Sequence, residues 1–267
     1  MNNPNLDART EILVKNLRQV VTDVFGGNLV GVYIHGSLAL GSYNPHVSDL
    51  DYVIVVSRAP SKSTKLRLMR ATFDKLIPYA PQKGLEFHVL TQNELKRGRH
   101  PFYFELHYSP MHKREYIDDP EGYVAVMHGL DPDLAVHLAV IWQSGIVVTG
   151  RPIRSVFSEI SSVDYFDSAL RDVSDAATEI MGNPVYTILN LCRLVGYMSD
   201  GIILSKADGG RWAIGHTDSM YNPIIKWALA EYTGSSGENR EPHKEALTSF
   251  AQAMLARIAA LQRRKED

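Results

Sequence analysis

The stretch GSLALGSYNPHVSDLDYVIVV at residues 36–56 decides the fold of this chain and the place of its site. Gly36 and Ser37 follow an apolar run and open a tight turn, and Asp49 and Asp51 open a second, β-branched run. Side chains two residues apart on a strand project from the same face, so these two carboxylates lie close together. Such carboxylates repel each other unless a cation keeps both ionised. The stretch therefore predicts a turn and a pair of metal ligands in one cleft.

Oxygen ligands alone favour Mg²⁺, which typically binds one or two protein carboxylates together with substrate phosphates. At Gly36 and Ser37, the start of a short helical turn, free backbone N–H groups can receive phosphate oxygens. Gly36 lets a ligand approach closely, and Ser37 adds a hydroxyl donor. The eleven residues from 38 to 48 suffice for a turn and a return loop between adjacent strands. We interpret the stretch as a nucleotide and Mg²⁺ site, with Asp49 and Asp51 as metal ligands.

A third apolar run, LEFHVLT at residues 85–91, supplies a candidate general base. Transfer of a nucleotidyl group to an alcohol needs metal ions at the phosphate and a base for the hydroxyl proton. Glu86 stands between two apolar residues, which raises a carboxyl pKa, whereas nearby Mg²⁺ would lower it. We predict Glu86 as catalytic base and third metal ligand beside Asp49 and Asp51. His88, two residues on and on the same face, is the alternative base.

Composition narrows the class of protein. The 267 residues, 45% of them apolar, can bury the core of one large domain or two smaller ones. A net charge of -2 gives no general attraction to nucleic acid. Cys192 is the single cysteine, and the ten histidines show no H-E-x-x-H or comparable spacing, which argues against zinc. With neither a basic, apolar leader nor an apolar stretch of about 20 residues, we expect a cytoplasmic protein without membrane or nucleic-acid partners.

The periodicity of apolar residues changes along the chain. The first part alternates helical and β-branched segments, whereas from about residue 163 we find helical periodicity and no convincing strand. We therefore predict an α+β fold, with a mixed sheet and helices in residues 1–155 and an all-α bundle in residues 156–267. The expected segments are a helix at 13–24, strands at 29–35, 51–57 and 85–91, a helix at 63–77, and helices beginning at Asp131–Pro132 and Pro184.

Together these motifs resemble a known family. GSLALG followed by SDLDYVIVV resembles the signature of the nucleotidyltransferase superfamily typified by DNA polymerase β. Over residues 10–232 the chain is similar to the aminoglycoside adenylyltransferases that modify streptomycin and spectinomycin, through LEFHVLT, FYFELHYSP, DPDLAVHLAVIWQSGIVVTGRPI and VYTILNLCRLVGYMSDGIILSKADGGRWA. The resemblance implies that residues 1–155 are a nucleotidyltransferase domain and residues 156–267 a helical domain. It also implies that ATP, Mg²⁺ and the acceptor bind between them.

The resemblance also assigns roles to individual residues. It implies that Glu86 is the catalytic base. From the sequence pattern alone, Arg193 in LCRL and Lys206 in SKADGGRWA would be interpreted as surface cations over an apolar helix face. The resemblance implies instead that both match basic residues that contact the phosphates. The nucleotide and metal positions of the family fall on Ser37, Ser48, Asp49 and Asp51.

The acceptor pocket is less well defined by the sequence. Glu105 and His107 in FELHYS either line this pocket, or Glu105 anchors the loop between the domains. Glu179 matches an acid of the streptomycin-modifying members. Three other positions depart from those members: Ser174 replaces an aromatic residue, Asn183 replaces an acid and Met111 replaces a tryptophan. We therefore expect spectinomycin, or another hydroxylated small molecule, to be favoured over streptomycin.

These observations predict an Mg²⁺-dependent enzyme that transfers AMP from ATP to a hydroxyl of a small cationic, aminoglycoside-like molecule and releases pyrophosphate. We expect a monomer whose activity confers antibiotic resistance. One alternative keeps the chemistry but uses a protein or RNA hydroxyl, as in a toxin–antitoxin setting. A second is a helical ribonuclease, because four residues separate Arg211 and His216. A third is a regulator that binds nucleotide without turnover.

Overall fold

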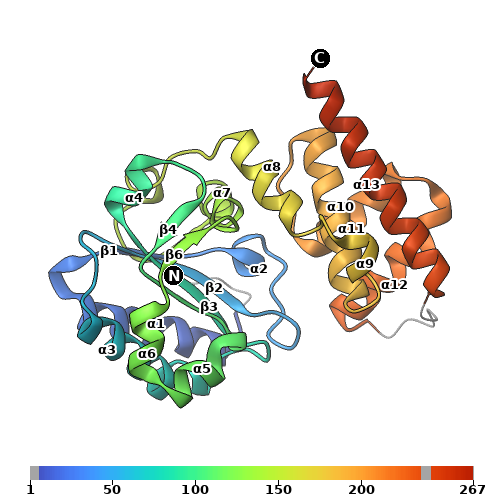
Figure 1. Cartoon of the computed structure of the whole chain (residues 1–267). Helices are drawn as coiled ribbons and strands as arrows, with labels where there is room; N and C mark the ends of the chain where they lie inside the picture. Colours follow the sequence, from blue (N-terminus) through green and yellow to red (C-terminus); the bar gives the residue numbers. More distant parts are fainter. Residues whose placement is uncertain (1–5, 236–241, 267) are drawn as a thin grey trace. The chain divides into compact units, whose positions relative to one another are not determined.

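The computed structural model describes residues 6–235 and 242–266. The chain divides into two compact units, Met1–Asp164 and Tyr165–Asp267. Figure 1 shows a sheet with helices in the first unit and helices in the second. The α+β class expected from the sequence is therefore confirmed, whereas the functional domain boundary after residue 155 stays a prediction. Among the described helices, none is long and apolar enough to cross a membrane.

The first unit is built on a mixed five-stranded sheet. Its strand order is β5-β3-β2-β1-β7, in which β2 and β3 run parallel and the other neighbours run antiparallel. A separate antiparallel pair is formed by β4 and β6. The strands are β1 (Leu29–Ile34), β2 (Leu50–Val56), β3 (Leu85–Thr91), β4 (Phe102–Phe104), β5 (Leu106–Tyr108), β6 (Gly129–Asp131) and β7 (Ile146–Gly150).

Four described helices of the first unit begin after a side chain that caps their free N–H groups. The first of them starts after Asp7, whose carboxylate accepts the N–H groups of Arg9 and Thr10, and it ends at Phe25, with Gly26 as its C-cap. The α-helices are α1 (Ala8–Phe25), α2 (Gly36–Ala39), α3 (Lys62–Lys75), α4 (Gln92–Arg97), α5 (Lys113–Asp118), α6 (Pro120–Val126) and α7 (Leu134–Ser144). Short 3-10 helices cover Gly26–Asn28, Ile77–Tyr79, Pro110–His112 and Ile153–Ser155.

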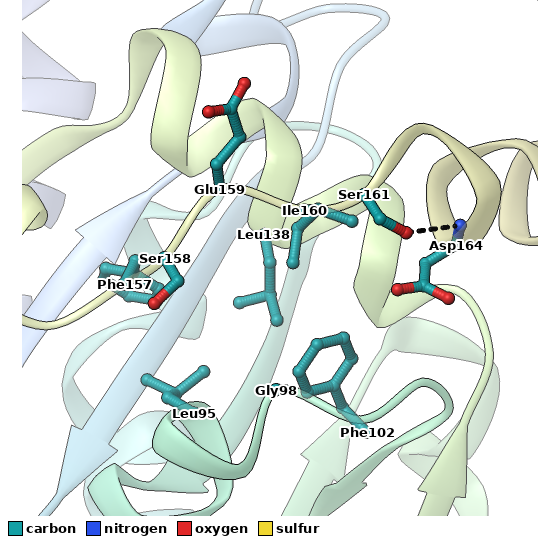
Figure 2. Close-up of a pocket in the computed structure, with 10 residues that line it drawn as sticks. All are labelled: Leu95, Gly98, Phe102, Leu138, Phe157, Ser158, Glu159, Ile160, Ser161 and Asp164. Atoms are coloured by element: carbon teal, nitrogen blue, oxygen red, sulfur yellow. Dashed lines mark hydrogen bonds between the residues drawn. The ribbon is translucent and has the colours of Figure 1, made fainter.

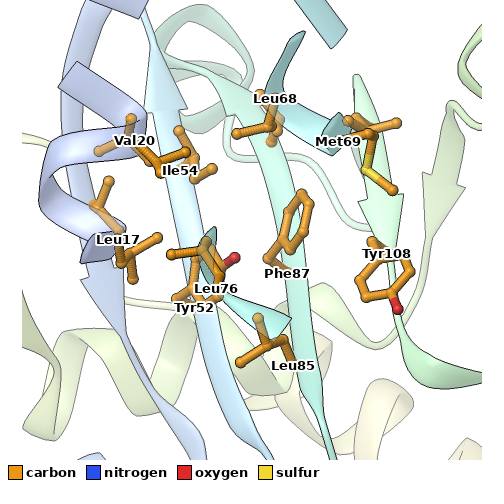
Figure 3. Packing of buried hydrophobic residues seen from close by; sticks show 14 of the residues in the cluster. Leu17, Val20, Tyr52, Ile54, Leu68, Met69, Leu76, Leu85, Phe87 and Tyr108 are labelled. Carbon is orange, nitrogen blue, oxygen red and sulfur yellow. The ribbon is translucent and has the colours of Figure 1, made fainter. Parts of the chain in front are cut away.

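Two apolar clusters cover the two faces of the sheet. On one face, side chains of α1 and α3 pack on Tyr52, Ile54 and Phe87, as Figure 3 shows. On the other face, Val53 and Leu90 pack with residues of α7. Because side chains alternate along a strand, Asp51, Glu86 and His88 belong to the face that carries α7. The fold thus holds these polar groups against a largely apolar layer.

The second unit is a helical bundle around one buried helix. That helix, α10 (Pro184–Asp200), packs against α11 (Lys206–His216), α12 (Asn222–Thr233) and α13 (Lys244–Glu266). It begins at Pro184 as predicted, and it is buried on most of its surface. Cys192 lies fully buried on it, where burial raises the pKa of the thiol to about 12. The unit also contains α9 (Ala176–Glu179) and the 3-10 helix Ser219–Tyr221, and α8 (Ser162–Arg171) leads into it.

The expected helix start at Asp131–Pro132 is wrong. The helix α7 begins at Leu134, and Asp131 is the last residue of β6. The Asp131 carboxylate does receive an N–H group, that of Asp133 at 2.9 Å, but its other oxygen bonds the ring of His88. The sequence pattern placed this helix start too early and missed the strand that ends at Asp131.

Candidate active site

Three carboxylates meet at one end of the sheet, where β2 and β3 begin. Asp51 stands opposite Glu86 in the parallel ladder of these strands, and Asp49 lies just before β2. One carboxylate oxygen of each residue lies within 4.8 Å of one from each of the others. The structure therefore brings together the three side chains that the sequence selected. Their oxygen-only chemistry fits the ligand preference of Mg²⁺.

The turn at Gly36 packs directly against this carboxylate group. Helix α2 begins at Gly36, whose φ of +62° is in the left-handed region that favours glycine. A Cβ atom at this position would collide with the Asp51 carboxylate. The backbone of the turn can approach the carboxylates only because residue 36 has no side chain.

The two serines of the turn and its return loop differ in their contacts. The Oγ atom of Ser37 is buried, and the described residues offer it no hydrogen-bond partner. A buried hydroxyl of this kind is costly unless something else bonds it, so Ser37 is suited to bind a polar ligand group. Ser48 is buried and its Oγ accepts the N–H of Asn44 at 3.2 Å. Ser48 thus shapes the loop that leads to Asp49.

Replacing Gly36 by Ala is expected to weaken Mg²⁺-dependent ATP binding by about tenfold, or about 1.4 kcal/mol, because the new methyl group would displace the Asp51 carboxylate. Titration calorimetry with ATP and Mg²⁺ measures the effect. Gly41→Ala is the matched control, since Gly41 has a φ of +74° and nothing within 4 Å of an added Cβ. Both variants carry the same backbone cost, of about 1 kcal/mol. Equal losses of ATP affinity in the two variants would show that collision with Asp51 is not the cause.

Several histidine rings lie close to Glu86. The Nε2 atom of His107, on β5, is 3.7 Å from Oε1 of Glu86. His88 stacks on His107 with ring centroids 4.0 Å apart, and its Nε2 bonds Asp131 at 2.8 Å. The sequence selected His88 and His107 but missed two further rings, His35 and His137, which stack with centroids 4.6 Å apart.

These rings set the charge of Glu86. Burial raises the pKa of Glu86, but interaction with the His107 side chain and the charges that His137 and His88 can carry lower it, to about 2 overall. Burial lowers the pKa of His88 to about 4, although its bond to Asp131 opposes this. At neutral pH Glu86 is therefore ionised and His88 is neutral. The rise in the pKa of Glu86 expected from its apolar neighbours is present but is outweighed by His88 on the same strand, His107 on β5 and His137 on α7.

The two basic residues predicted to contact phosphates lie in the second unit. Arg193, on α10, donates from Nε to the Leu204 carbonyl at 2.9 Å and from Nη1 to Oδ1 of Asn190 at 3.1 Å. Lys206 opens α11, and its Nζ lies 4.5 Å from the centroid of the Tyr186 ring. Both side chains are therefore held at the same helix pair, and their role toward phosphate stays a prediction.

The predicted acceptor residues of the first unit differ in their placement. His107 lies beside Glu86, as described above. Glu105 is outside the carboxylate group, and its N–H donates to the Val89 carbonyl at 2.8 Å. Met111, in the 3-10 helix after β5, is 79% exposed. Of these three residues, the structure thus brings only His107 to the carboxylates.

The predicted acceptor residues of the second unit lie next to each other. Glu179 ends α9, and Asn183 precedes α10. Both are exposed, and the N–H of Asn183 donates to the carbonyl of Glu179 at 3.2 Å. Their side chains are thus available to a ligand, and their contact with an acceptor stays a prediction.

A cavity of about 130 Å³ lies elsewhere in the first unit. Figure 2 shows the apolar side chains of Leu95, Phe102 and Leu138 in its wall, and the N–H of Asp164 bonded to Oγ of Ser161 near its edge. None of its ten lining residues is a predicted site residue. We therefore place the chemistry at the carboxylates and not in this cavity.

The mixed sheet, its carboxylates and the helical second unit define a nucleotidyltransferase. Residues 14–117 match the nucleotidyltransferase domain family. Residues 155–257 match the C-terminal domain family of the aminoglycoside adenylyltransferases. The chain belongs to the aminoglycoside adenylyltransferase family, and it is an enzyme of the nucleotidyltransferase class.

Individual relatives agree with this assignment. Spectinomycin 9-adenylyltransferases of Staphylococcus aureus strains Mu50 and N315 are each 25% identical to the chain over 230 residues, which cover 84% of this chain and 85% of theirs. A crystal structure of a spectinomycin adenyltransferase from Enterococcus faecialis, with ATP and spectinomycin, has the same fold. It superposes with a TM-score of 0.76 at 21% identity and covers 92% of this chain and 98% of that one.

Proposed function

We propose that the enzyme transfers AMP from ATP to a hydroxyl group of an aminoglycoside-type antibiotic, with Mg²⁺ as cofactor and spectinomycin favoured over streptomycin. The observation that carries this proposal is the group of Asp49, Asp51 and Glu86 beside the turn at Gly36 and Ser37. The names of the relatives support the choice of ATP and spectinomycin. The same activity in the cytoplasm would confer resistance.

Each part of the proposed reaction has a residue to perform it. Glu86 accepts the proton of the acceptor hydroxyl, whose oxygen attacks the α-phosphorus of ATP. The bond from that phosphorus to the oxygen that bridges to the β-phosphate breaks, and pyrophosphate leaves. Asp49 and Asp51, with Glu86, would hold Mg²⁺, which neutralises charge on the phosphates when bound. The backbone N–H groups at Gly36 and the Ser37 hydroxyl hold phosphate oxygens.

The preference for spectinomycin over streptomycin rests on two positions, one without an aromatic ring and one without a negative charge. Met111 is strongly exposed but offers no aromatic ring for stacking. Asn183, also exposed, offers no negative charge to a cationic acceptor. A bulky, highly charged acceptor such as streptomycin would gain less from these positions than a smaller one. The negative charge of the carboxylate group attracts a cationic acceptor of either size.

The test is an incubation of the enzyme with ATP labelled at the α-phosphate, Mg²⁺ and one acceptor at a time. We expect label on spectinomycin, little or none on streptomycin, and release of pyrophosphate. Omitting Mg²⁺ should abolish transfer. Label on streptomycin at an equal or higher rate would refute the preference. Label only on protein or RNA would refute the acceptor class while keeping the chemistry.

Neither of the other sequence-based alternatives is favoured by an observation. Arg211 pairs with Asp208 at 2.7 Å, and His216 stacks on Trp212 with ring centroids 4.5 Å apart. The ribonuclease hypothesis therefore relies on two side chains that already have partners within their own helix. A regulator without turnover would not need Glu86 beside the two aspartates.

A further inference from the structure

A second group of potential metal ligands lies behind the carboxylates, on the sheet face that carries α7. Glu86, His88 and His137 each offer one ligand atom, and these three atoms lie within 4.8 Å of one another. The Nδ1 atoms of His88 and His137 are buried, and neither has a hydrogen-bond partner among residues 6–235 and 242–266. Buried polar atoms are seldom left unpaired. Two unpaired nitrogens beside one carboxylate are therefore candidates to bind a ligand.

Asp131 orients one of these nitrogens. Its Oδ2 bonds Nε2 of His88 at 2.8 Å, which assigns the ring proton to Nε2 and leaves Nδ1 as the free lone pair. A histidine that binds a metal usually donates its other N–H to a carboxylate in this way. His88 is only 1% exposed, so the ring is fixed by its surroundings as well.

Ring geometry decides between two candidate groups. His88, His107 and Asp131 also each offer one ligand atom, and these atoms lie within 4.8 Å of one another. However, the rings of His88 and His107 are stacked with an interplanar angle of 12°. Imidazole lone pairs lie in the ring plane, so nearly parallel stacked rings do not direct them at one ion. The rings of His88 and His137 are inclined by 57°, with centroids 5.7 Å apart, and their lone pairs can converge.

We propose that Glu86, His88 and His137 bind a transition-metal ion of the Zn²⁺ class, and that this ion competes with Mg²⁺ for Glu86. Two neutral imidazoles and one carboxylate are a ligand set that Zn²⁺ accepts, with a fourth position left for water. Bonds of about 2.0 Å in a tetrahedron would place ligand atoms roughly 3.3 Å apart, so the ligand atoms must approach one another by up to about 1.5 Å. An ion held here would withdraw Glu86 from its proposed role as base, and it would inhibit the enzyme.

This proposal departs from the expectation that zinc is absent, which rested on histidine spacing. His88 is on β3 and His137 on α7, and 48 residues separate them in the sequence. Spacing motifs detect ligands on one helix or one loop. They do not detect ligands that meet because a helix packs on a sheet.

The first experiment measures metal binding directly, without any assay of activity. Equilibrium dialysis with Zn²⁺ is expected to give one tightly bound ion in the wild-type chain. Co²⁺ in its place should give the strong visible absorption of a four-coordinate ion. Asp131→Asn removes a partner that orients His88, and it is expected to weaken Zn²⁺ binding by about 10- to 100-fold. His137→Gln removes a ligand itself and is expected to weaken Zn²⁺ binding at least as much. His243→Gln, at an exposed histidine of the second unit, is the matched control and should bind like the wild type.

Circular dichroism and thermal unfolding without metal show whether each variant folds. A wild-type chain that binds no Zn²⁺, or a folded His137→Gln variant that binds it as tightly as the wild type, would overturn the site. Because this readout is independent of catalysis, it also separates failure of this site from failure of the proposed function.

The second experiment tests the competition. Zn²⁺ added to the Mg²⁺-dependent reaction is expected to inhibit the wild type. The same Zn²⁺ concentrations should not change the rate of the His137→Gln variant. More Mg²⁺ should relieve the inhibition. Equal sensitivity of the two proteins would mean that Zn²⁺ acts at Asp49 and Asp51, and it would overturn the proposed competition.

Discussion

Replacing Glu86 by Gln is expected to lower kcat by roughly 10²- to 10⁴-fold, the usual contribution of a well-placed general base. The amide keeps the size of the side chain and one ligand oxygen, but it cannot accept the hydroxyl proton at neutral pH. ATP affinity should change little, because Asp49 and Asp51 would still hold the metal. Rates with saturating ATP and acceptor, together with ATP titration calorimetry, separate the two effects.

The matched control for this change is Glu121→Gln. Glu121 is an exposed carboxylate of the same unit, paired with Lys62 at 3.1 Å. Surface pairs of this kind contribute little, so the control should retain full activity. Near-normal turnover of Glu86→Gln would remove Glu86 from the role of base. A loss shared equally by both variants would point to a general defect of the preparation.

The second large effect is expected for Asp49→Asn, which removes one of the predicted metal ligands. ATP affinity in the presence of Mg²⁺ should fall at least tenfold, since even residues that only orient metal ligands contribute 10- to 100-fold to metal affinity. Affinity measured without Mg²⁺ should change far less or even rise, because a negative charge near the phosphates has been removed. Titration calorimetry with and without Mg²⁺ gives both values.

For this variant, Asp118→Asn is the control. Asp118 is 65% exposed and pairs with Arg114 at 3.4 Å, and its helix α5 contains no predicted site residue. It should bind ATP like the wild type. If Asp49→Asn binds ATP and Mg²⁺ with unchanged affinity, the assignment of Asp49 as a ligand is wrong, whatever its position beside Asp51.

The three central strands could be predicted because each is a continuous β-branched or aromatic run that is buried on both faces. Strands β1, β2 and β3 depart from the expected 29–35, 51–57 and 85–91 by one residue at most at each end. The edge strand β7 and the short strands β4, β5 and β6 were missed, and the three-residue strands carry no recognisable period. They exist because a neighbouring chain segment offers hydrogen bonds, which the local sequence does not record.

The same distinction holds for the site. Asp49, Asp51 and Ser37 belong to one local stretch, and Glu86 follows at the same end of the next strand, so a strand-by-strand analysis could bring them together. His137 could not be found in this way. It lies among apolar residues of α7, and its meaning depends on which strand that helix covers. The lowered pKa of Glu86 was missed for the same reason.

The hydrogen-bond ladder between β2 and β3 has a consequence for how this gene can change. Asp51 and Glu86 are ladder partners, and neighbouring side chains along a strand point to opposite faces. A slip of β3 by one residue against β2 would place Leu85 or Phe87 opposite Asp51 and turn Glu86 to the other face of the sheet. Insertions and deletions between 57 and 84, outside α3, leave this pairing intact. Homologues should therefore vary in length there and not within the strands.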